Sequence, residues 1–329
     1  MNKVKVAVLG TGSLGQHHAR IYSELHAAGL VEMTGIYDAN TANAKAVADK
    51  NKLHVFTSLD EAAAASDALN IVTPTITHYE IAKKLLGQGK HVLVEKPITD
   101  QTAQATELIE LARQKNCVLQ VGHVERFNPV FKYVASQAND PRFIECQRLS
   151  PFPARSMDIG VVLDLMIHDL DIILKLVKSP VVSVDAMGMK VLSQSEDIAN
   201  ARIKFANGCV AAITASRVSA DRLRKIRVYN GPANPCYISA DFRLQEGQIS
   251  RLAPGSAPLP AGASIVSEFG QAKIVREPAP IEKGEPLKLE LEGFVASVRE
   301  RKPPVVTGED AKQALDLAFE ITRQVRAGW

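Results

Sequence analysis

A glycine-rich hexad, GTGSLG, occupies residues 10–15 and directly follows a short apolar, β-branched segment at residues 4–9. A helical pattern begins within the hexad. The order strand, glycine turn, helix constrains the fold more than the hexad alone, because G-x-G-x-x-G also arises by chance. Gly10 permits a tight turn, Gly12 lets the backbone approach a pyrophosphate, and Gly15 lets helix and strand pack closely. We therefore expect a dinucleotide-binding Rossmann unit whose helix N-terminus faces the phosphates.

An acidic residue stands where a ribose-binding carboxylate is expected. Residues 31–37 form a second strand-like segment, and Asp38 follows it, roughly 20 positions after the last glycine. Its carboxylate can accept hydrogen bonds from a ribose 2′-hydroxyl and would repel a 2′-phosphate, and no arginine follows within the next ten residues. We therefore expect NAD, with NADP less favoured. A second interpretation stays open, in which Asp38 caps the helix that begins near Thr41.

Short apolar segments alternate with amphipathic helices through the first 122 residues, which predicts a doubly wound parallel sheet. Further strands are expected at 53–56, 68–72, 92–94 and 118–121, with helices at 76–86 and 100–115. Ligands bind beyond the carboxyl ends of such strands. Three polar groups at strand ends are expected to line one crevice: Thr73-Pro74-Thr75, Glu95-Lys96-Pro97 and Gly122-His123.

Lys96 is the most informative residue of that crevice. It stands between a buried strand and Pro97, which fixes the exit of the chain and favours an extended conformation at Lys96. A lysine held in this way faces the crevice. The alternative is an ordinary solvated surface lysine.

A second group of titratable residues lies in a strongly apolar segment, residues 161–177, that predicts a buried helix. Asp164, His168 and Asp171 fall at i, i+4 and i+7 and therefore share one face. Because unpaired buried charge is costly, they must pair, bind a metal or face a ligand. A histidine beside a carboxylate suits a general base for an alcohol proton. A hydrogen-bonded structural histidine is the alternative, and a metal is disfavoured because no second histidine lies nearby.

Composition narrows the class of protein. A chain of 329 residues predicts two domains, which we place at residues 1–122 and 123–329. A net charge of +3 with scattered charges gives no basis for a nucleic-acid partner. The sequence shows no signal-peptide core and no long apolar run, so we expect no membrane association and a cytoplasmic location. The four cysteines show no zinc-site spacing: Cys117, Cys146, Cys209 and Cys236.

The C-terminal half shows strand-like alternation and two amphipathic helices. Hairpin turns are predicted at Asn207-Gly208 and Glu246-Gly247, and residues 253–263 predict an irregular loop. A basic run from Arg217 to Arg227 suits either a substrate diphosphate or a solvated surface. Strands are expected at 181–189, 201–205, 210–216, 225–229, 237–244 and 272–276, and helices at 287–299 and 310–326.

Taken together, these motifs resemble the glucose-fructose oxidoreductase/inositol dehydrogenase family, called Gfo/Idh/MocA. The resemblance implies an α/β fold, with an N-terminal Rossmann sheet and a C-terminal α/β domain built on a large, open, mostly antiparallel sheet. The outer face of that sheet often forms oligomer contacts, so a homodimer or homotetramer is expected. The motifs are GTGSLGQHH at 10–18, TPT at 73–75 with His78, EKP at 95–97, RFNP at 126–129, the segment 164–171 and VTGEDA at 306–311.

The resemblance also implies an NAD(P)-dependent dehydrogenase acting on CH–OH groups, with Lys96, Asp164 and His168 as the catalytic group. These three residues, with Arg126 and Asn128, are expected to bind the substrate, and no metal is expected. The implied cofactor-binding residues are Gly10, Gly12, Ser13, Leu14, Gly15, Asp38, Thr73, Pro74, Thr75, His78, Glu95 and Lys96.

Within the family, GHVERFNP at 122–129 and LDLMIHDLD at 163–171 are most similar to members of the UDP-N-acetylglucosamine 3-dehydrogenase type. The implied substrate is a UDP-N-acetylhexosamine oxidised at its 3-hydroxyl, although Met166 stands where many family members have glycine. Three alternatives stay open. They are a dehydrogenase of a free sugar or inositol, a catalytically silent NAD-binding regulator, and a reductase of a non-sugar substrate.

Overall fold

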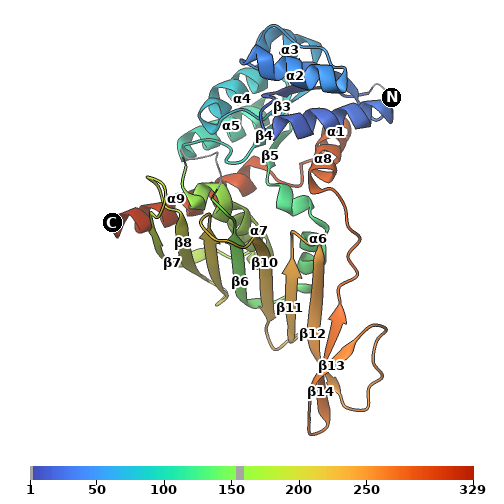
Figure 1. The fold of residues 1–329 in the computed structure, drawn as a ribbon, viewed down its shortest axis with the longest axis vertical. Helices are drawn as coiled ribbons and strands as arrows, with labels where there is room; N and C mark the ends of the chain where they lie inside the picture. The colour runs from blue at the N-terminus through green and yellow to red at the C-terminus, as the bar shows by residue number, and fades with distance from the viewer. Residues whose placement is uncertain (1–2, 153–158) are drawn as a thin grey trace. The chain divides into compact units, whose positions relative to one another are not determined.

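The computed structural model describes residues 3–152 and 159–329 (Figure 1). The chain divides into two compact units. The first comprises Met1–Val124 and Glu285–Lys312, and the second comprises Glu125–Gly284 and Gln313–Trp329. The predicted boundary after residue 122 lies close to the first crossing between units. A single boundary does not describe the return of the chain to the first unit at Glu285.

The first unit contains a five-stranded parallel sheet in the order β2-β1-β3-β4-β5. The parallel Rossmann sheet predicted from the alternating pattern is confirmed. The prediction of a strand at residues 53–56 is wrong, because that segment forms only one isolated bridge, from Val55 to Ile36. The strands are β1 (Lys5–Leu9), β2 (Glu32–Tyr37), β3 (Ala68–Ile71), β4 (His91–Glu95) and β5 (Leu119–Gly122).

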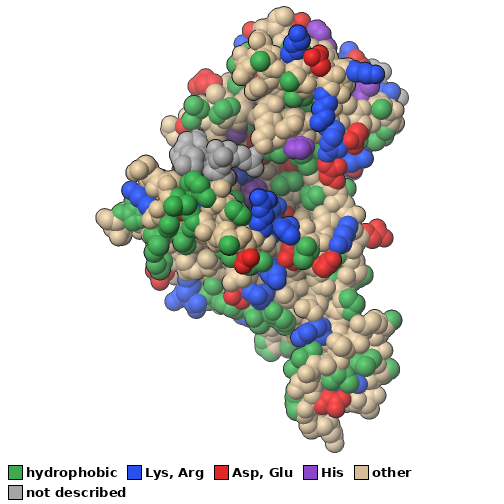
Figure 2. Space-filling model, in the orientation of Figure 1, with side chains coloured by type: hydrophobic (Ala, Val, Ile, Leu, Met, Phe, Trp, Pro, Cys, Tyr) green, Lys and Arg blue, Asp and Glu red, His purple; other side chains and the backbone are tan. Residues whose placement is uncertain are grey.

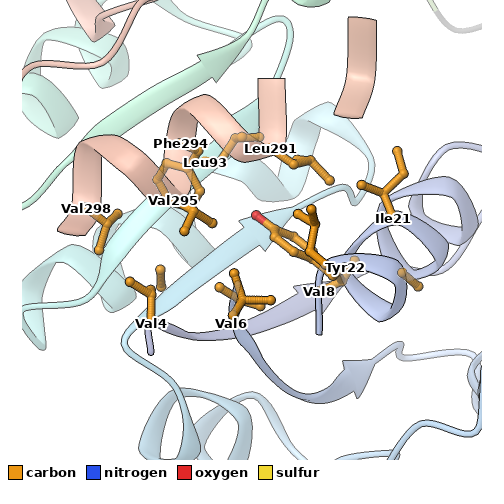
Figure 3. Packing of buried hydrophobic residues seen from close by; sticks show 14 of the residues in the cluster. Val4, Val6, Val8, Ile21, Tyr22, Leu93, Leu291, Phe294, Val295 and Val298 are labelled. Atoms are coloured by element: carbon orange, nitrogen blue, oxygen red, sulfur yellow. The ribbon is translucent and has the colours of Figure 1, made fainter. Parts of the chain in front are cut away.

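Helices cover this sheet, and one of them comes from the far end of the chain. In Figure 3, Leu291 and Phe294 of that helix, α8, pack over Val4 and Val6, which belong to one buried apolar cluster. Helix α8 therefore supplies part of the core of the N-terminal unit. The helices of the first unit are α1 (Gly15–Ala27), α2 (Thr41–Asn51), α3 (Leu59–Ala65), the 3₁₀ turn η1 (Thr75–Thr77), α4 (His78–Gly87), α5 (Thr102–Gln114) and α8 (Pro286–Glu300).

The second unit is built on a nine-stranded sheet in the order β13-β14-β12-β11-β10-β6-β9-β8-β7. Neighbouring strands are antiparallel except β6 and β9, which are parallel, so the expected mostly antiparallel sheet is confirmed. The strands are β6 (Pro141–Leu149), β7 (Val181–Met189), β8 (Ile198–Phe205), β9 (Val210–Ser216), β10 (Leu223–Asn230), β11 (Cys236–Asp241), β12 (Glu246–Pro254), β13 (Ser264–Phe269) and β14 (Ala272–Pro278).

One of the two predicted hairpin turns is correct. Gly208 has φ +85° in the turn between β8 and β9. The turn predicted at Glu246-Gly247 is wrong, because Gly247 lies within β12 and pairs with Ala240. The turn precedes it, and its left-handed position is Gln245, with φ +53°. A non-glycine residue in that conformation gives no signal in the sequence.

Helices cover one face of the nine-stranded sheet. Arg148 of β6 bonds to Asp169 of α7 (Ile167–Val177), and Arg251 of β12, on the same face, bonds to Gln137 of α6 (Pro129–Gln137). The opposite face carries half-exposed side chains such as Tyr229. The remaining elements are η2 (Val124–Phe127), the π-helical turn η3 (Val162–Met166) and α9 (Gly308–Ala327), which begins in the first unit and continues in the second.

In residues 3–152 and 159–329, no helix is long and apolar enough to cross a bilayer. No group of histidine, cysteine, aspartate and glutamate side chains within these ranges is arranged to hold a metal ion.

Candidate cofactor and active site

The three glycines of the hexad serve three different purposes. Gly10 has φ +88°, and a Cβ on it would lie 2.5 Å from the carbonyl oxygen of Val72. A Cβ on Gly15 would lie 2.0 Å from the carbonyl oxygen of Gly10, so the helix packs directly on the turn. A Cβ on Gly12 would meet nothing within 4 Å. The fold requires the first and third glycines, whereas Gly12 leaves open space for a ligand.

The start of helix α1 offers backbone donors to that space. Gly12, Ser13 and Leu14 are exposed. Among the described residues, no side chain caps α1, and its first turn contains no acidic residue. Uncapped N–H groups and the positive end of the helix dipole suit an anion such as a pyrophosphate. This turn therefore fits the diphosphate of NAD.

Asp38 is held beside the glycine turn. Its Oδ2 accepts hydrogen bonds from the Thr11 N–H at 2.6 Å and the Thr11 hydroxyl at 2.7 Å, and its Oδ1 accepts one from the Asn40 N–H at 2.8 Å. Asn40, not Asp38, caps α2, by accepting from the N–H groups of Ala42 and Asn43. The capping interpretation of Asp38 is therefore wrong. Its carboxylate lies next to the first glycine, where it suits a ribose hydroxyl.

His78 ties together the ends of β3 and β4. Its Nε2 lies 2.9 Å from the Thr73 carbonyl oxygen, and its Nδ1 lies 2.9 Å from the Pro97 carbonyl oxygen. The ring is buried, and burial lowers its pKa below the ordinary value. In the same turn, the Thr77 hydroxyl donates a hydrogen bond to the Thr73 hydroxyl at 2.7 Å. His78 thus shapes the crevice, and its predicted contact with the cofactor, like those of Thr73, Pro74 and Thr75, stays a prediction.

Glu95 points back into the first unit. Its Oε2 accepts a hydrogen bond from the Lys96 N–H at 3.2 Å, and its Oε1 lies 3.2 Å from Nε2 of the buried His18. A Cβ on Gly122 would lie 2.8 Å from the Glu95 carboxyl carbon, so only glycine fits beside it. The backbone at Lys96 is therefore anchored from within the unit.

In the second unit, Asp164 lies in a π-helical turn, and His168 lies in the α-helix that follows. The Ile167 N–H donates to the Val162 carbonyl oxygen, five residues back, so the single α-helix predicted for residues 161–177 is wrong in its first turn. Asp164 and His168 are half-buried, as a ligand-facing pair requires. Asp171 is buried and accepts a hydrogen bond from Arg126.

The predicted substrate-binding residues Arg126 and Asn128 are both buried. Arg126 Nη1 donates to Asp171 Oδ1 at 3.1 Å. Asn128 caps α6 and donates from Nδ2 to Glu125 Oε2 and to the Phe242 carbonyl oxygen, each at 3.0 Å. These contacts fix the segment that begins the second unit, and substrate binding by the two residues stays a prediction.

Sequence reasoning missed a buried ionic cluster centred on Arg148. Its guanidinium donates two bonds to the Asp169 carboxylate, at 2.9 and 3.0 Å, and one to Glu125 Oε1 at 3.0 Å. Burial raises the pKa of Asp169, and Arg148 opposes that shift. Arg224 reaches Glu125 Oε1 at 3.3 Å with a half-exposed side chain. The only signal in the sequence was the strand alternation that places Arg148 on the same face as Cys146.

The basic run at residues 217–227 does not form one anion-binding cluster. Arg217 is fully buried, where it bonds to Asp197 at 2.8 Å. Arg224 lies on the helix-covered face of β10, whereas Arg227 lies on the opposite face and pairs with Glu145 at 3.4 Å. The alternating directions of strand side chains separate these charges. These arginines therefore do not lie together at one site, and a contact of any one of them with a substrate diphosphate stays a prediction.

The fold and site define an NAD-binding oxidoreductase, and comparison with known proteins identifies its family. Residues 4–123 match the family model described as oxidoreductase family, NAD-binding Rossmann fold. Residues 133–230 match the model described as GFO/IDH/MocA C-terminal domain. The chain therefore belongs to the Gfo/Idh/MocA family and is a dehydrogenase acting on CH–OH groups.

Two relatives are similar over nearly the whole chain. One is UDP-N-acetylglucosamine 3-dehydrogenase of Acidithiobacillus ferrooxidans, 33% identical over 99% of both chains. A solved structure of that enzyme superposes with a TM-score of 0.86, at 32% identity and 99% coverage of both chains. The other is scyllo-inositol 2-dehydrogenase (NAD(+)) of Bacillus subtilis, 26% identical over 99% of this chain and 95% of the relative.

The different roles of Gly12 and Gly15 predict different defects. Gly15→Ala forces a Cβ against the Gly10 carbonyl and should lower the free energy of unfolding by about 1–3 kcal/mol. Gly12→Ala should leave unfolding unchanged and abolish NADH binding, since its Cβ fills only the ligand space. Urea unfolding and NADH fluorescence titration measure the two effects. A Gly12→Ala protein that binds NADH normally would contradict the assignment of this turn to the pyrophosphate.

The position of Asp38 predicts its effect on cofactor choice. Asp38→Ala removes a charged acceptor worth about 1.5–3 kcal/mol, so the preference for NADH over NADPH should fall roughly 10- to 100-fold. Titration of the variant with both reduced cofactors measures the ratio. Asp49→Ala, on the exposed face of α2, is the matched control and should leave the ratio unchanged. An unchanged ratio in Asp38→Ala would rule out its role at the ribose.

Proposed function

We propose that this dehydrogenase oxidises the 3-hydroxyl of a UDP-N-acetylhexosamine. The observation that carries the proposal is the similarity, at 33% identity and across 99% of both chains, to an enzyme named UDP-N-acetylglucosamine 3-dehydrogenase. The motif residues Lys96, Asp164 and His168 add chemical support, because a lysine and a carboxylate–histidine pair can handle an alcohol proton.

Bound NAD supplies the hydride acceptor at C4 of its nicotinamide. His168 accepts the hydroxyl proton, because an imidazole titrates near neutral pH, and the Asp164 carboxylate orients the ring. Lys96 donates a hydrogen bond to the same oxygen and stabilises the negative charge that develops on it.

Local structure supports these roles. The backbone at Lys96 follows a buried strand and is held by the Glu95 carboxylate, so its side chain starts from a fixed point. Asp164 lies in a π-helical turn, and such turns occur frequently at functional sites. Half-burial leaves Asp164 and His168 accessible to a ligand while limiting their exchange with water.

A second candidate function is oxidation of an inositol or a free sugar. The 26% identity to scyllo-inositol 2-dehydrogenase over 99% of this chain favours it, since both reactions oxidise a ring secondary alcohol. The uridine diphosphate group distinguishes the candidates, because only the first requires it.

Assaying one set of substrates with wild type and variants tests the proposal. UDP-N-acetylglucosamine, N-acetylglucosamine and scyllo-inositol are each incubated with NAD or NADP, and the reduced cofactor is followed by absorbance. We expect turnover of the nucleotide sugar with NAD. Lys96→Ala and His168→Ala should each lower kcat by roughly 100-fold or more and leave NADH binding intact.

Lys115→Ala and His54→Ala, which alter exposed residues, are the matched controls. Turnover of scyllo-inositol alone would replace the proposed substrate with the second candidate. Wild-type kcat in either catalytic-site variant would overturn the assigned roles.

We also propose that the open face of the nine-stranded sheet joins copies of the chain into a homodimer or homotetramer. On this face the Tyr229 ring packs against Phe143 at 5.6 Å and Tyr237 at 4.9 Å between ring centroids. Further apolar side chains are exposed on β12 and β13, where Figure 2 shows green side chains around the β12–β14 hairpins.

The cysteines are free thiols, so we propose a cytoplasmic location.

Substitution on this face tests the assembly. Tyr229→Glu places a charge in the aromatic group and should shift the mass measured by light scattering toward that of the 35.6 kDa monomer. Trp329→Glu, which alters an exposed aromatic residue at the C-terminus, is the control and should not change the mass. A wild-type protein that is monomeric at micromolar concentration would exclude the proposed oligomer.

A further inference from the structure

Six polar side chains are buried together between the first sheet and helices α1 and α8. On this face β1 is apolar, as at Val6 and Val8, whereas Asn70, Glu95 and Gln120 of the three strands beside it are polar. Such a change from apolar to polar within one buried face needs a physical reason. The six residues are His18 and Tyr22 of α1, Asn70 of β3, Glu95 of β4, Gln120 of β5 and Glu290 of α8.

Close contacts connect four of these side chains and end at Lys96. The Tyr22 hydroxyl donates to Asn70 Oδ1 at 3.0 Å, and the Asn70 amide nitrogen lies 3.1 Å from His18 Nδ1. Because that amide nitrogen is a donor, His18 Nδ1 accepts, and the ring proton is on Nε2. Nε2 lies 3.2 Å from Glu95 Oε1, but neither atom has a hydrogen-bond partner among the described residues. Glu95 Oε2 accepts from the Lys96 N–H.

Glu290 is the one member whose carboxyl group has no hydrogen-bond partner among the described residues. It is fully buried, and its backbone oxygen accepts a bond from Gln120 Nε2 at 3.3 Å. Its neighbours Leu291 and Phe294 pack into the apolar core, and Figure 3 shows the Tyr22 hydroxyl pointing toward α8. Burial, and the nearby charge of Glu95, raise the pKa of Glu290 well above its ordinary value. A fully buried carboxyl group without a hydrogen-bond partner is favoured in its neutral, protonated form.

We propose that Glu290 is a positioning residue: as a neutral carboxylic acid it donates a hydrogen bond to the Glu95 carboxylate, which fixes the end of β4 that carries Lys96. A protonated carboxyl has one O–H donor, and Glu95 is the only carboxylate of the cluster. The titratable groups that act on Glu290 or are affected by it are Glu95 on β4 and Tyr22 on α1. Strands β3 and β5 contribute only amides. The inference rests on the proposed role of Lys96.

The burial of Glu290 favours a functional explanation. A leucine at this position would extend the apolar surface of α8 without burying a polar group, so the carboxyl lowers stability where it stands. Positions that break a folding rule in this way occur chiefly at functional sites. A hydrogen-bond donor at Glu290 would stabilise the negative charge of Glu95 beside the Lys96 backbone.

The first test requires neither cofactor nor substrate. Infrared spectra at pH 8 are compared between wild type, Glu290→Gln, and Glu292→Gln, a control on the same helix with a less buried carboxyl. We expect the carbonyl band of a protonated carboxylic acid in wild type and in Glu292→Gln, and its loss in Glu290→Gln. A wild-type spectrum without this band would overturn the proposal.

The second test separates positioning from folding. Glu290→Leu should unfold at a temperature at least equal to wild type, bind NADH normally and lose about 10- to 100-fold in kcat. Glu290→Gln, which keeps a donor, should restore most of the activity.

Either of two results would sink the proposal: wild-type kcat in Glu290→Leu, or equal impairment in Glu290→Gln and Glu290→Leu. If Glu290→Leu does not fold, the Gln variant and the infrared band still decide the question. If wild type oxidises none of the offered substrates, the proposed function fails by itself, and the infrared band still tests the protonated carboxyl.

Discussion

The contact between the Gly15 and Gly10 backbones is the constraint on which the cofactor site depends. No side chain fits between the helix and the turn, so α1 packs directly on the turn that follows β1. Its uncapped N–H groups then lie at the edge where the parallel strands end, and Asp38 is drawn to the same turn by Thr11. A site for an anionic dinucleotide thus follows from backbone packing, before any side chain contacts the ligand.

The sequence was sufficient for features that depend on local pattern. Periodicity predicted the parallel sheet, and the glycine hexad predicted its first turn. Prediction from the sequence failed where a distant contact or an unusual backbone conformation determines the local structure. Gln245 turns the chain with positive φ, which no motif marks, and the opening turn of the 161–177 segment is π-helical. The partners of Arg148 lie more than twenty residues away, so no spacing rule could find them.

Buried charges in this protein are used to hold loops and segments in place. Arg148 joins Glu125 to Asp169, Arg217 holds Asp197, and Glu95 connects its strand end to α1. Losing one partner of such a pair leaves an uncompensated charge, which costs far more than the pair contributes. A motif residue such as Glu95 is therefore constrained by its neighbours as strongly as by a ligand. Its presence in a motif does not by itself distinguish packing from ligand binding as the reason for that residue.

The return of the chain to the first unit at Glu285 has a consequence for biosynthesis. Residues Leu291, Phe294, Val295 and Val298 complete the apolar core that Val4 and Val6 begin. While the protein is being translated, that core therefore stays open until residues 291–298 have left the ribosome. A shortened polypeptide ending near Val124 would expose this apolar surface and be prone to aggregate, although it contains the whole nucleotide-binding sheet.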